Sequence, residues 1–571
     1  MPIRDISAFS FKYEDFKERM SNNTLKTLCF AIFFAIFSLS CTQDKASVKK
    51  GAGKNPTGTE NSALVPGGPR EPGVFRIFDK NYDFVNNGAT TAGQLAQTFP
   101  VRDGSDGGVP TKIALLSNGE DSLALRMRAL EGAKKSIRIQ SFIFDGDESG
   151  EYVFERLLEK KKNNPNMFIG VITDLSAHVD PDKAPRSINM FLKLSKAGIP
   201  VLGYGELPDL MNAADLKSAL LSANFRYHEK MWIIDGEDPQ SGIAIIGGLN
   251  IANEYFRIGA DPKDGAEKDR KERWRDQDMA LTGSIVADIM KRYDDNYGRF
   301  DSATKNENDK VWNEIFDTDL FSLGRDLLSQ LLVRYSDVLR GRVRQTAARE
   351  ISSIQFYPAT ARFLATNVRP EFKEEKMRYI HRAYVDMIRS ARSSIEIENS
   401  YFVLSASVQE IRLELIEAVK RGVDVSVLTN SEKSNDLPQM TIAGRYYYQD
   451  YYAANAEAKP NASGAKAQFK IYEWSSSTLG TLHSKFAVFD REAAIVGSYN
   501  MDSRSFQYQT EDVVVFKDST LAGQLSDTFK ADISPENAHE VSDNEAKSYD
   551  KTQIMNSLGG ADLGAILQEM L

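Results

Sequence analysis

A chain of 571 residues is too long for a single ordinary hydrophobic core, and at about 150 residues per domain it predicts two to four units. The hydrophobic content of 42% and the charged content of 26% are those of a globular protein and exclude a largely disordered one. The net charge of −9 argues against a dedicated nucleic-acid-binding protein, because lysine and arginine supply most of the affinity for a phosphate backbone.

The N-terminus carries an apolar segment that is too short to span a membrane. Residues 28–39 read LCFAIFFAIFSL, about a dozen residues against the roughly 20 of a transmembrane helix, and this length is typical of a secretion signal. Lys26 precedes the segment and Cys41 follows it. The stretch resembles a bacterial lipoprotein signal, which implies that Cys41 is the lipidated first residue of the mature chain. An uncleaved anchor is the alternative, and Met20 is an alternative start to Met1.

The cysteine content agrees with this interpretation. Cys29 and Cys41 are the only cysteines, so the mature chain has no pair for a disulfide and no cysteine-based metal site. The expected location is therefore the envelope of a bacterium, lipid-anchored on the periplasmic side or at the cell surface. If the signal is cleaved without lipidation, we expect a secreted protein.

Further along the chain, one pattern occurs twice. AKKSIRIQSFIF starts at Ala133 and ARSSIEIENSYF starts at Ala391, and each alternates apolar residues as a strand does. Each is followed by a helical pattern and then a buried strand, MFIGVITD in the first copy and VDVSVLTN in the second. Strand, helix and strand in this order build an α/β fold with helices on the faces of a sheet.

We therefore predict two homologous halves, each a mixed, largely parallel β-sheet flanked by helices, with the active site at the interface between them. The predicted parts are a leader at 1–41, a flexible linker at 42–74, an N-terminal half at 75–300, a helical connector at 301–353, a C-terminal half at 354–530 and a tail at 531–571. The amphipathic end of the tail is expected to be a packing helix.

Each half also contains the pattern His-x-Lys-x-x-x-x-Asp. It reads HEKMWIID at 228–235 and HSKFAVFD at 483–490, in a chain that has five histidines. With ordinary residue frequencies, two such matches among five histidines arise by accident on the order of once in ten thousand sequences. The remaining histidines, His178, His381 and His539, have no such context and are expected to be incidental.

The residues after each histidine are apolar and favour a strand, so His228 and Lys230 lie on one face. His483 and Lys485 repeat this arrangement. A second strand follows each motif, IAIIGGLN or AAIVGSYN, and a hairpin brings its terminal asparagine back to the histidine. The asparagines are Asn250 and Asn500, and the small residues before them, expected to let the backbone approach a ligand, are Gly247, Gly248, Gly497 and Ser498.

Two such sets facing each other suit a phosphodiester. Its reaction needs charge stabilisation on the phosphate oxygens, an in-line nucleophile and a proton for the leaving oxygen. Lysines and asparagines can hold the oxygens, while one imidazole attacks phosphorus and the other protonates the leaving group. Because two lysines supply the charge, we expect neither a metal nor a cofactor.

This constellation resembles the phospholipase D superfamily, from about residue 110 to 520. The resemblance includes both histidine motifs, GGLN, GSYN, WRDQDMALTG at 274–283 and NMDSRSFQYQTE at 500–511, with Gln509 where many members have asparagine. It implies that His228 is the nucleophile that forms a phosphohistidine and that His483 is the general acid. It also implies that Asp276 and Glu511 orient the imidazoles, each on the histidine of the opposite half.

The same resemblance assigns the last residues of the motifs, Asp235 and Asp490, to structural roles at strand ends. Two further stretches allow two interpretations each. The charged run at 261–274 is either a lid over the cleft or a solvated loop, and the tyrosines of GRYYYQDYYAAN at 444–455 either meet a membrane or border the core.

The first functional hypothesis is a membrane-tethered enzyme that hydrolyses or transfers phospholipid head groups, similar to phospholipase D or cardiolipin synthase. It implies a phospholipid substrate, a lipid anchor in the membrane and a monomer with both motifs in one chain. The second hypothesis is a secreted nuclease of the same superfamily. The third is a surface protein whose former active site now serves adhesion or partner binding.

Overall fold

The computed structural model describes residues 73–78, 108–174, 177–178, 183–204, 225–259, 273–303, 335–366, 378–560 and 568. The predicted leader with Cys41 and most of the charged run at 261–274 lie outside these residues. No helix within the described ranges is long and apolar enough to cross a membrane. Residues 69–207 and 223–571 belong to one compact unit, so the two predicted halves are described as a single body.

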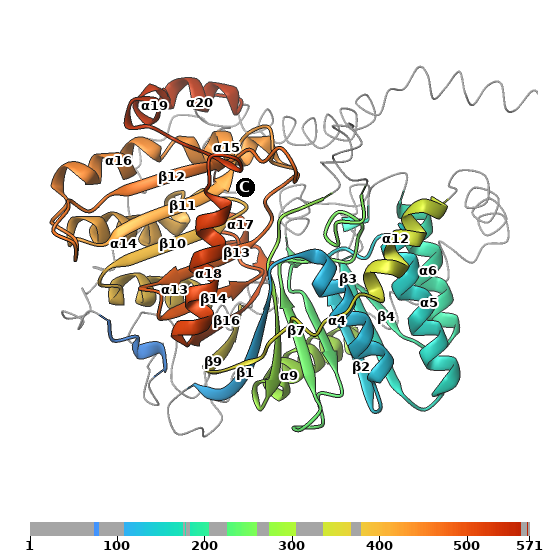
Figure 1. The fold of residues 1–571 in the computed structure, drawn as a ribbon. Helices are drawn as coiled ribbons and strands as arrows, with labels where there is room; N and C mark the ends of the chain where they lie inside the picture. The colour runs from blue at the N-terminus through green and yellow to red at the C-terminus, as the bar shows by residue number, and fades with distance from the viewer. Residues whose placement is uncertain are drawn as a thin grey trace, which may run out of the picture. The chain divides into compact units, whose positions relative to one another are not determined.

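The described strands form one mixed sheet of 15 strands and a second sheet of two (Figure 1). From the centre outward, the N-terminal half contributes β1 (Val109–Leu116), β8 (Asp278–Gly283), β7 (Ile243–Gly247), β6 (Met231–Ile234), β2 (Ser136–Ser141), β3 (Phe168–Asp174) and β4 (Val201–Tyr204). The C-terminal half contributes β9 (Tyr357–Ala365), β16 (Asp512–Lys517), β14 (Ala493–Gly497), β13 (Lys485–Phe489), β10 (Ser394–Asn399), β11 (Asp424–Asn430), β12 (Phe469–Trp474) and the short edge strand β17 (Ala538–Glu540).

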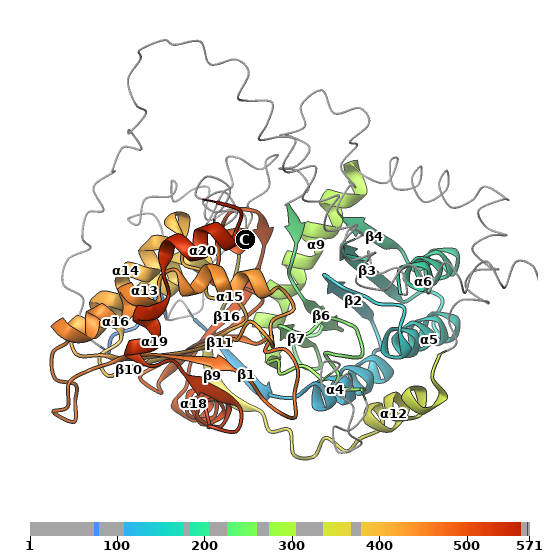
Figure 2. The same cartoon turned by 90° about the horizontal axis from the view of Figure 1, so that it is seen from above.

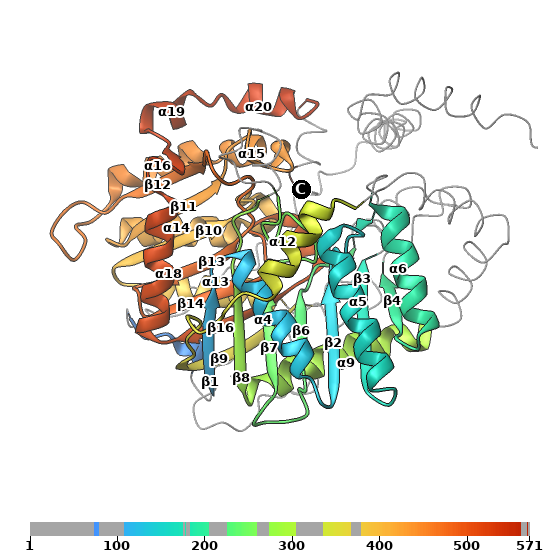
Figure 3. The same cartoon turned by 45° about the vertical axis from the view of Figure 1, so that its right-hand side comes forward.

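The two halves meet at the centre of the large sheet. β1 pairs antiparallel with β9, with Thr111 opposite Ala359, and Figure 3 shows these strands side by side. Outward from this pair, the strands of one half repeat the order of the other, so the halves are related by an approximate twofold axis. The predicted duplication of a mixed α/β half is therefore confirmed.

The expectation of a largely parallel sheet is wrong. In the described chain, parallel pairing within the large sheet is confined to β2, β3 and β4 in one half and to β10, β11 and β12 in the other. The remaining ladders are antiparallel. The reason is the short connections around each histidine motif, because a tight hairpin can join only antiparallel strands.

Both predicted hairpins are present. β6 pairs antiparallel with β7 and β13 with β14, and every residue of β6, β13 and β14 is buried. These segments are runs of apolar, largely β-favouring residues, which is the pattern of a strand covered on both faces. The hairpins hold each histidine at the start of one strand and each asparagine just beyond the end of the next.

Asp235 and Asp490 close the two histidine motifs at equivalent turns. The carboxylate of Asp235 accepts hydrogen bonds from the backbone N–H groups of Lys134, Lys135 and Ser136, at 2.6–3.1 Å. The carboxylate of Asp490 accepts from the corresponding backbone of residues 392–394. Both aspartates have a positive φ, 52° and 55°, a conformation that aspartate tolerates better than most residues. Each therefore joins its hairpin to the neighbouring strand.

Helices cover both faces of the sheet, as Figure 2 shows for α9 and α4 on opposite sides of the N-terminal strands. The N-terminal half carries α4 (Gly119–Gly132), α5 (Glu148–Asn163), α6 (Ala184–Lys196), α9 (Ile285–Ala303) and α12 (Asp337–Ala347). The C-terminal half carries α13 (Tyr379–Ser390), α14 (Gln409–Lys420), α15 (Pro438–Arg445), α16 (Tyr448–Glu457), α17 (Ser503–Gln507), α18 (Ser519–Asp532), α19 (Asp543–Ser548) and α20 (Lys551–Ser557). One apolar cluster is built mainly from each half, and a third contains residues of both. Phe75, Ile77 and Phe78, predicted to belong to the N-terminal half, pack in the cluster of the C-terminal half.

The tyrosine-rich stretch borders the core. Tyr448 and Tyr451 on α16 are 1% and 0% exposed, and both belong to the apolar cluster of the C-terminal half. The Tyr451 ring stacks on Phe469 with 4.6 Å between the ring centroids. Of the two interpretations, packing in the protein interior is the one that these contacts support.

Replacing Asp235 by alanine should lower stability strongly. Three backbone N–H groups would lose their acceptor, and alanine would have to adopt a positive φ. We expect a loss of about 3 kcal/mol, which is a fall of roughly 3 °C in the apparent unfolding temperature measured by scanning calorimetry.

Asp235→Asn is the matched variant, because asparagine keeps one side-chain oxygen and tolerates the same φ. It should lose about half as much stability as the alanine variant. As a surface control, Asp527→Ala removes an exposed partner of Arg491 and should change stability by less than about 1 kcal/mol. Equal, small effects of all three changes would contradict this role of Asp235.

Candidate active site

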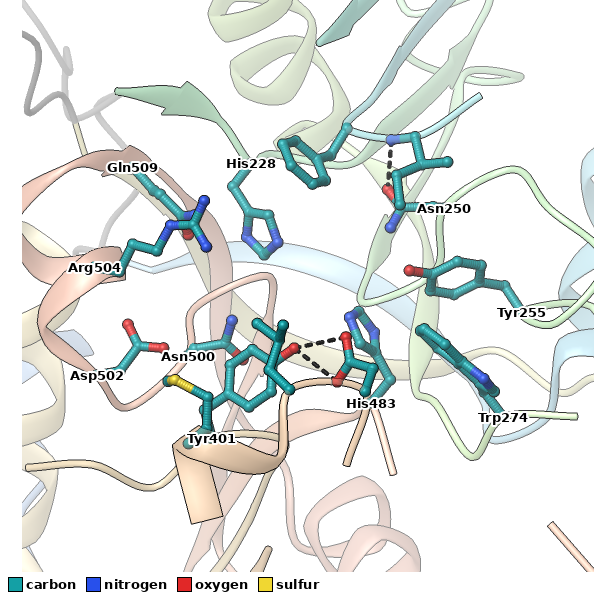
Figure 4. Close-up of a pocket in the computed structure, with 15 residues that line it drawn as sticks. His228, Asn250, Tyr255, Trp274, Tyr401, His483, Asn500, Asp502, Arg504 and Gln509 are labelled. Carbon is teal, nitrogen blue, oxygen red and sulfur yellow. Dashed lines mark hydrogen bonds between the residues drawn. The ribbon is translucent and has the colours of Figure 1, made fainter. Parts of the chain in front are cut away.

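The two motif histidines line one pocket, although they come from different halves. His228 lies just before β6 and His483 just before β13, and both imidazoles point into the pocket in Figure 4. Its volume is about 150 Å³. The pocket is lined by Phe142, Ile143, His228, Asn250, Tyr255, Trp274, Tyr401, Asp436, Leu437, Met440, His483, Asn500, Asp502, Arg504 and Gln509.

Each imidazole is hydrogen-bonded to a carboxylate of the other half. Nδ1 of His228 lies 2.9 and 3.0 Å from the two carboxylate oxygens of Glu511. Nδ1 of His483 lies 2.7 Å from Oδ2 of Asp276. Because an acidic partner fixes the proton on Nδ1, each Nε2 is left with a free lone pair.

Short backbone pairings between the halves fix these contacts. β5 (Arg226–Tyr227) and β15 (Gln509–Thr510) form a parallel two-stranded sheet, and the N–H of His228 donates to the carbonyl of Thr510 at 3.0 Å. A parallel bridge joins Arg275 to Leu482 in the same way, and the N–H of His483 donates to the carbonyl of Arg275 at 2.6 Å. Each histidine is thus paired, through its backbone, with the residue before its acid.

The two acids are held differently. Glu511 accepts hydrogen bonds from the hydroxyls of Ser498, at 2.5 Å, and Ser505, at 2.7 Å. Asp276 accepts from the backbone N–H of Gln277 at 2.7 Å. Burial raises the pKa of each carboxyl to about 7. Ser505 lies within the motif at 500–511 but is not among the site residues predicted from the sequence.

The lysines lie beneath the histidines. Lys230 and Lys485 are 2% and 1% exposed, and neither is among the residues that line the pocket. Each ammonium group hydrogen-bonds to the backbone carbonyl of its own histidine. Lys485 also donates to the hydroxyl of Ser400 at 2.8 Å, whereas Lys230 faces the ring of Phe142 at 5.5 Å.

The electrostatics differ between the two histidines. Burial, followed by the charges of Lys230, Lys485 and Arg504, lowers the pKa of His228 well below its ordinary value. Burial and Lys485 also lower the pKa of His483, but the negative charge of Asp436 opposes that shift. Burial therefore favours the neutral form of both imidazoles, and the charge of Asp436 weakens that preference at His483.

The asparagines flank the imidazoles. Oδ1 of Asn250 accepts from the backbone N–H of Ile143 at 3.1 Å, which leaves its amide N–H₂ directed to the pocket in Figure 4. Asn500 is 3% exposed and lines the same pocket. Its carbonyl oxygen has no hydrogen-bond partner among the described residues.

The small residues before the asparagines have a structural reason that differs from the expected one. A Cβ atom on Gly248 would collide with the carboxylate of Asp276, and one on Gly247 would collide with Asp278. Gly497 leaves room for the backbone of β16 in the same way. The backbone at these small residues is thus packed against the acids and strands of the chain itself. Ser498 takes the place of the second glycine, and its hydroxyl hydrogen-bonds to Glu511.

A separate acidic cluster lies outside the pocket. Carboxylate oxygens of Asp145, Asp147 and Glu254 are close enough together to hold a cation. The ammonium of Lys183 already lies among them, 2.6 Å from Asp145 and 3.2 Å from Glu254. Lys183 therefore compensates part of the negative charge of this cluster.

The three remaining histidines have partners elsewhere. His178 contacts the backbone of Asp174 and Phe144, His381 lies 3.3 Å from Glu410, and His539 lies 2.8 Å from Glu545. None of them is among the residues that line the pocket.

Comparison with known proteins gives one family match and several relatives. Residues 384–533 match the model described as "Cardiolipin synthase, PLD-like domain". Cardiolipin synthase A of Pseudomonas aeruginosa strain LESB58 is 26% identical over 422 residues, which are 74% of this chain and 66% of that protein. The probable cardiolipin synthase YwiE of Bacillus subtilis is 25% identical, with the same two coverages. The chain thus aligns with just under two thirds of the length of these relatives.

Among solved structures, a phosphatidylserine synthase from Haemophilus influenzae Rd KW20 has a TM-score of 0.52 to this chain at 12% identity. The match covers 80% of this chain and 95% of that one, and it concerns the fold. The duplicated sheet with paired histidines is thus a phospholipase D-like fold, as the sequence motifs predict. Residues 384–533 are thus similar to the phospholipase D-like domain of cardiolipin synthases.

The buried lysines predict that anion binding takes up protons. Burial lowers the pKa of Lys230 to about 7 and that of Lys485 to about 8. A bound sulfate favours their charged forms and the protonated forms of Asp276 and Glu511, so its affinity should fall roughly tenfold between pH 6.5 and 8.5. Calorimetry near pH 7.5 in two buffers of different ionisation enthalpy should record net proton uptake.

In Lys230→Met, the proton uptake should be smaller and sulfate binding weaker. The exposed Lys517→Met is the matched control and should leave both unchanged. Sulfate binding that releases protons, or that is independent of pH over this range, would contradict the assignment of these lysines to an anion site.

Proposed function

We propose that the protein is a phospholipid-modifying enzyme of the phospholipase D type, which transfers or hydrolyses head groups through a phosphohistidine. The observation that carries this proposal is the pair of imidazoles that face one pocket, each oriented by a carboxylate of the other half. The match to the cardiolipin synthase model and the relatives of that name support a phospholipid as substrate.

In the first step, Nε2 of His228 attacks the phosphorus atom of the phosphodiester. Glu511 holds the imidazole by its Nδ1–H and stabilises the positive charge that develops on it. The bond from phosphorus to the leaving alcohol breaks, and Nε2 of His483 donates a proton to the departing oxygen. The low pKa of His228 supports its role as the nucleophile, because a neutral imidazole has a lone pair to donate.

His483 suits the complementary role of general acid and base. A phosphodiester anion bound in the pocket favours its protonated form. In the second step, His483 accepts the proton of water or of an alcohol, whose oxygen attacks phosphorus while the bond to His228 breaks. Asp276 orients this imidazole throughout.

The phosphate oxygens are expected to meet several donors. The amide of Asn250 and the guanidinium of Arg504 line the pocket, as does Asn500. The ammonium groups of Lys230 and Lys485 are buried behind the lining and add positive charge close to His228. Arg504 is an addition to the lysines and asparagines expected from the sequence, and it lies four residues after Asn500 in the quoted motif.

Product analysis tests the proposed function. The purified protein is incubated with vesicles of mixed phospholipids and, separately, with single-stranded and duplex DNA, beside His228→Asn. We expect mass spectrometry to detect phosphatidic acid or a transferred phosphatidyl product such as cardiolipin. The rate of product formation should be about a thousandfold lower in the variant. DNA fragments without any lipid product would replace this proposal by the nuclease hypothesis.

His483→Asn distinguishes the two histidine roles. Without its acid and base, the enzyme should react slowly with an activated substrate and then retain the phosphatidyl group on His228, where peptide mapping at alkaline pH detects it. A label on residue 483 of His228→Asn, and none on His228 of His483→Asn, would reverse the roles. Absence of any product with either substrate class from the wild type would favour a binding protein.

The protein is further proposed to be attached to the bacterial envelope through a lipid on Cys41. The apolar segment at 28–39 and the cysteine that follows it support this proposal. Cells grown with labelled palmitate should yield labelled protein in the membrane fraction. Cys41→Ser should lose the label, and persistence of the label in that variant would contradict the anchor.

A further inference from the structure

The pocket has an acidic wall beside His483 that the two proposed steps do not use. The hydroxyl of Tyr401 donates to both carboxylate oxygens of Asp436, at 2.8 Å each, and Figure 4 shows these bonds next to the imidazole of His483. Both residues line the pocket. Tyr401 follows β10, and Asp436 lies in the loop that joins β11 to α15.

Tyr401 is a donor in this pair. Burial and the neighbouring charge of Asp436 raise the pKa of its hydroxyl well above the ordinary value, so the phenol keeps its proton. In the described chain, Tyr401 is the hydrogen-bond partner of the Asp436 side chain, and no lysine or arginine forms an ion pair with it. The carboxylate oxygens therefore retain lone pairs that can accept further hydrogen bonds.

Within the described residues, the N-terminal half has no tyrosine at the place of Tyr401. β2 and β10 occupy matching places in the sheet, with Ile137 and Ile395 each opposite the last residue of its motif strand. The position that corresponds to Tyr401 is then Ile143, which has no hydroxyl. The hydroxyl that holds Asp436 thus has no counterpart at Ile143, while the carboxyl of Asp502 lines the pocket on the side of Arg504.

Asp436 lines the pocket but is exposed, so water can complete its hydrogen bonding in the free enzyme. It repels the negative phosphodiester, and it weakens the positive field of the lysines below. Such a group is expected to have a partner in the working complex. The partner lies on the His483 side, where the leaving alcohol departs and the attacking alcohol enters.

The chemistry of the wall favours a hydroxyl group as this partner. Oδ1 of Asn500 is a second acceptor without a partner in the described residues, and it lines the same pocket. The hydroxyl of Tyr255 also lines the pocket beside His483, at 5.2 Å between ring centroids. An ammonium group would have to approach the buried cation of Lys485, whereas a neutral hydroxyl avoids that repulsion.

We propose that Asp436, positioned by Tyr401, is a specificity-determining residue that binds the second hydroxyl of a vicinal diol and thereby selects a polyol over water as acceptor. This inference rests on the proposed function and decides between transfer and hydrolysis. The acceptor is a glycerol-type alcohol, free or as a lipid head group.

The transfer step balances with the groups present. One hydroxyl of the diol attacks phosphorus, the new O–P bond forms as the bond from phosphorus to Nε2 of His228 breaks, and the hydroxyl proton passes to Nε2 of His483. The adjacent hydroxyl donates a hydrogen bond to Asp436, which exchanges no proton. Binding the second hydroxyl places the first one at His483, which water and monohydric alcohols cannot reproduce.

Competition between acceptors tests the proposal. The enzyme is incubated with vesicles of phosphatidylglycerol and phosphatidylethanolamine, together with equal concentrations of deuterated glycerol and 1-propanol. Mass spectrometry then separates deuterated phosphatidylglycerol, phosphatidylpropanol and phosphatidic acid. We expect the wild type to prefer glycerol to propanol by about tenfold or more, since a charge-assisted hydrogen bond is gained.

Asp436→Asn should reduce the glycerol-to-propanol ratio by about tenfold and raise the share of phosphatidic acid, while transfer to propanol changes by less than about threefold. Tyr401→Phe should shift the ratio in the same direction by less. Glu432→Gln removes a charge from the same loop outside the pocket and should leave the ratio unchanged. A merely structural defect would reduce transfer to both alcohols alike.

Three results would overturn the inference. An unchanged ratio in Asp436→Asn would remove Asp436 from acceptor selection. A loss of transfer to ethanolamine, tested as a third acceptor, with the glycerol preference intact would assign the wall to an ammonium group. A third result is that Asp436→Asn impairs transfer to free glycerol but not transfer to the lipid head group. That result would restrict the site to soluble acceptors and contradict the broader claim. By contrast, a wild type without any lipid product would fail the proposed function itself.

Discussion

Each motif histidine is held by the half to which it does not belong, and the rest of the site depends on this exchange. Residues 226–228 pair with the backbone at 508–510, and residues 481–483 pair with that of Arg275. These two short pairings bring Glu511 to His228 and Asp276 to His483. Because the contacts cross between halves, neither half alone can orient its own imidazole, and the single sheet joined through β1 and β9 keeps the two sets in register.

The two halves have the same strand order, but the surroundings of their histidines differ. Arg504 lies on the side of His228 and contributes to its low pKa, whereas Asp436 opposes the same shift at His483. Lys485 hydrogen-bonds to Ser400, while Lys230 faces the ring of Phe142. A duplicated α/β half thus provides two equivalent histidines, and the loops added to each half give them different surroundings. Different surroundings are what a nucleophile and a general acid require.

The sequence predicted the duplicated mixed fold and the residues that meet at the pocket, because the motif is repeated and its strands alternate regularly. Glu511 and Asp276 came from the family resemblance, since nothing in their spacing reveals contacts across the halves. Tyr401 and Asp436 were missed because each follows the end of a different strand, and only the sheet order brings them together. The largely parallel sheet was wrong, and Gly248 leaves room for the carboxylate of Asp276.

The most direct measurement is a crystal structure of the protein with tungstate, a phosphate-like anion that histidine-based sites can bind. The account predicts one tungstate between Nε2 of His228 and Nε2 of His483, with Nδ1 of each imidazole still on the carboxylate of the other half. The ammonium groups of Lys230 and Lys485 should lie on the same anion. Tungstate bound within one half alone, or imidazoles paired with acids of their own half, would contradict it.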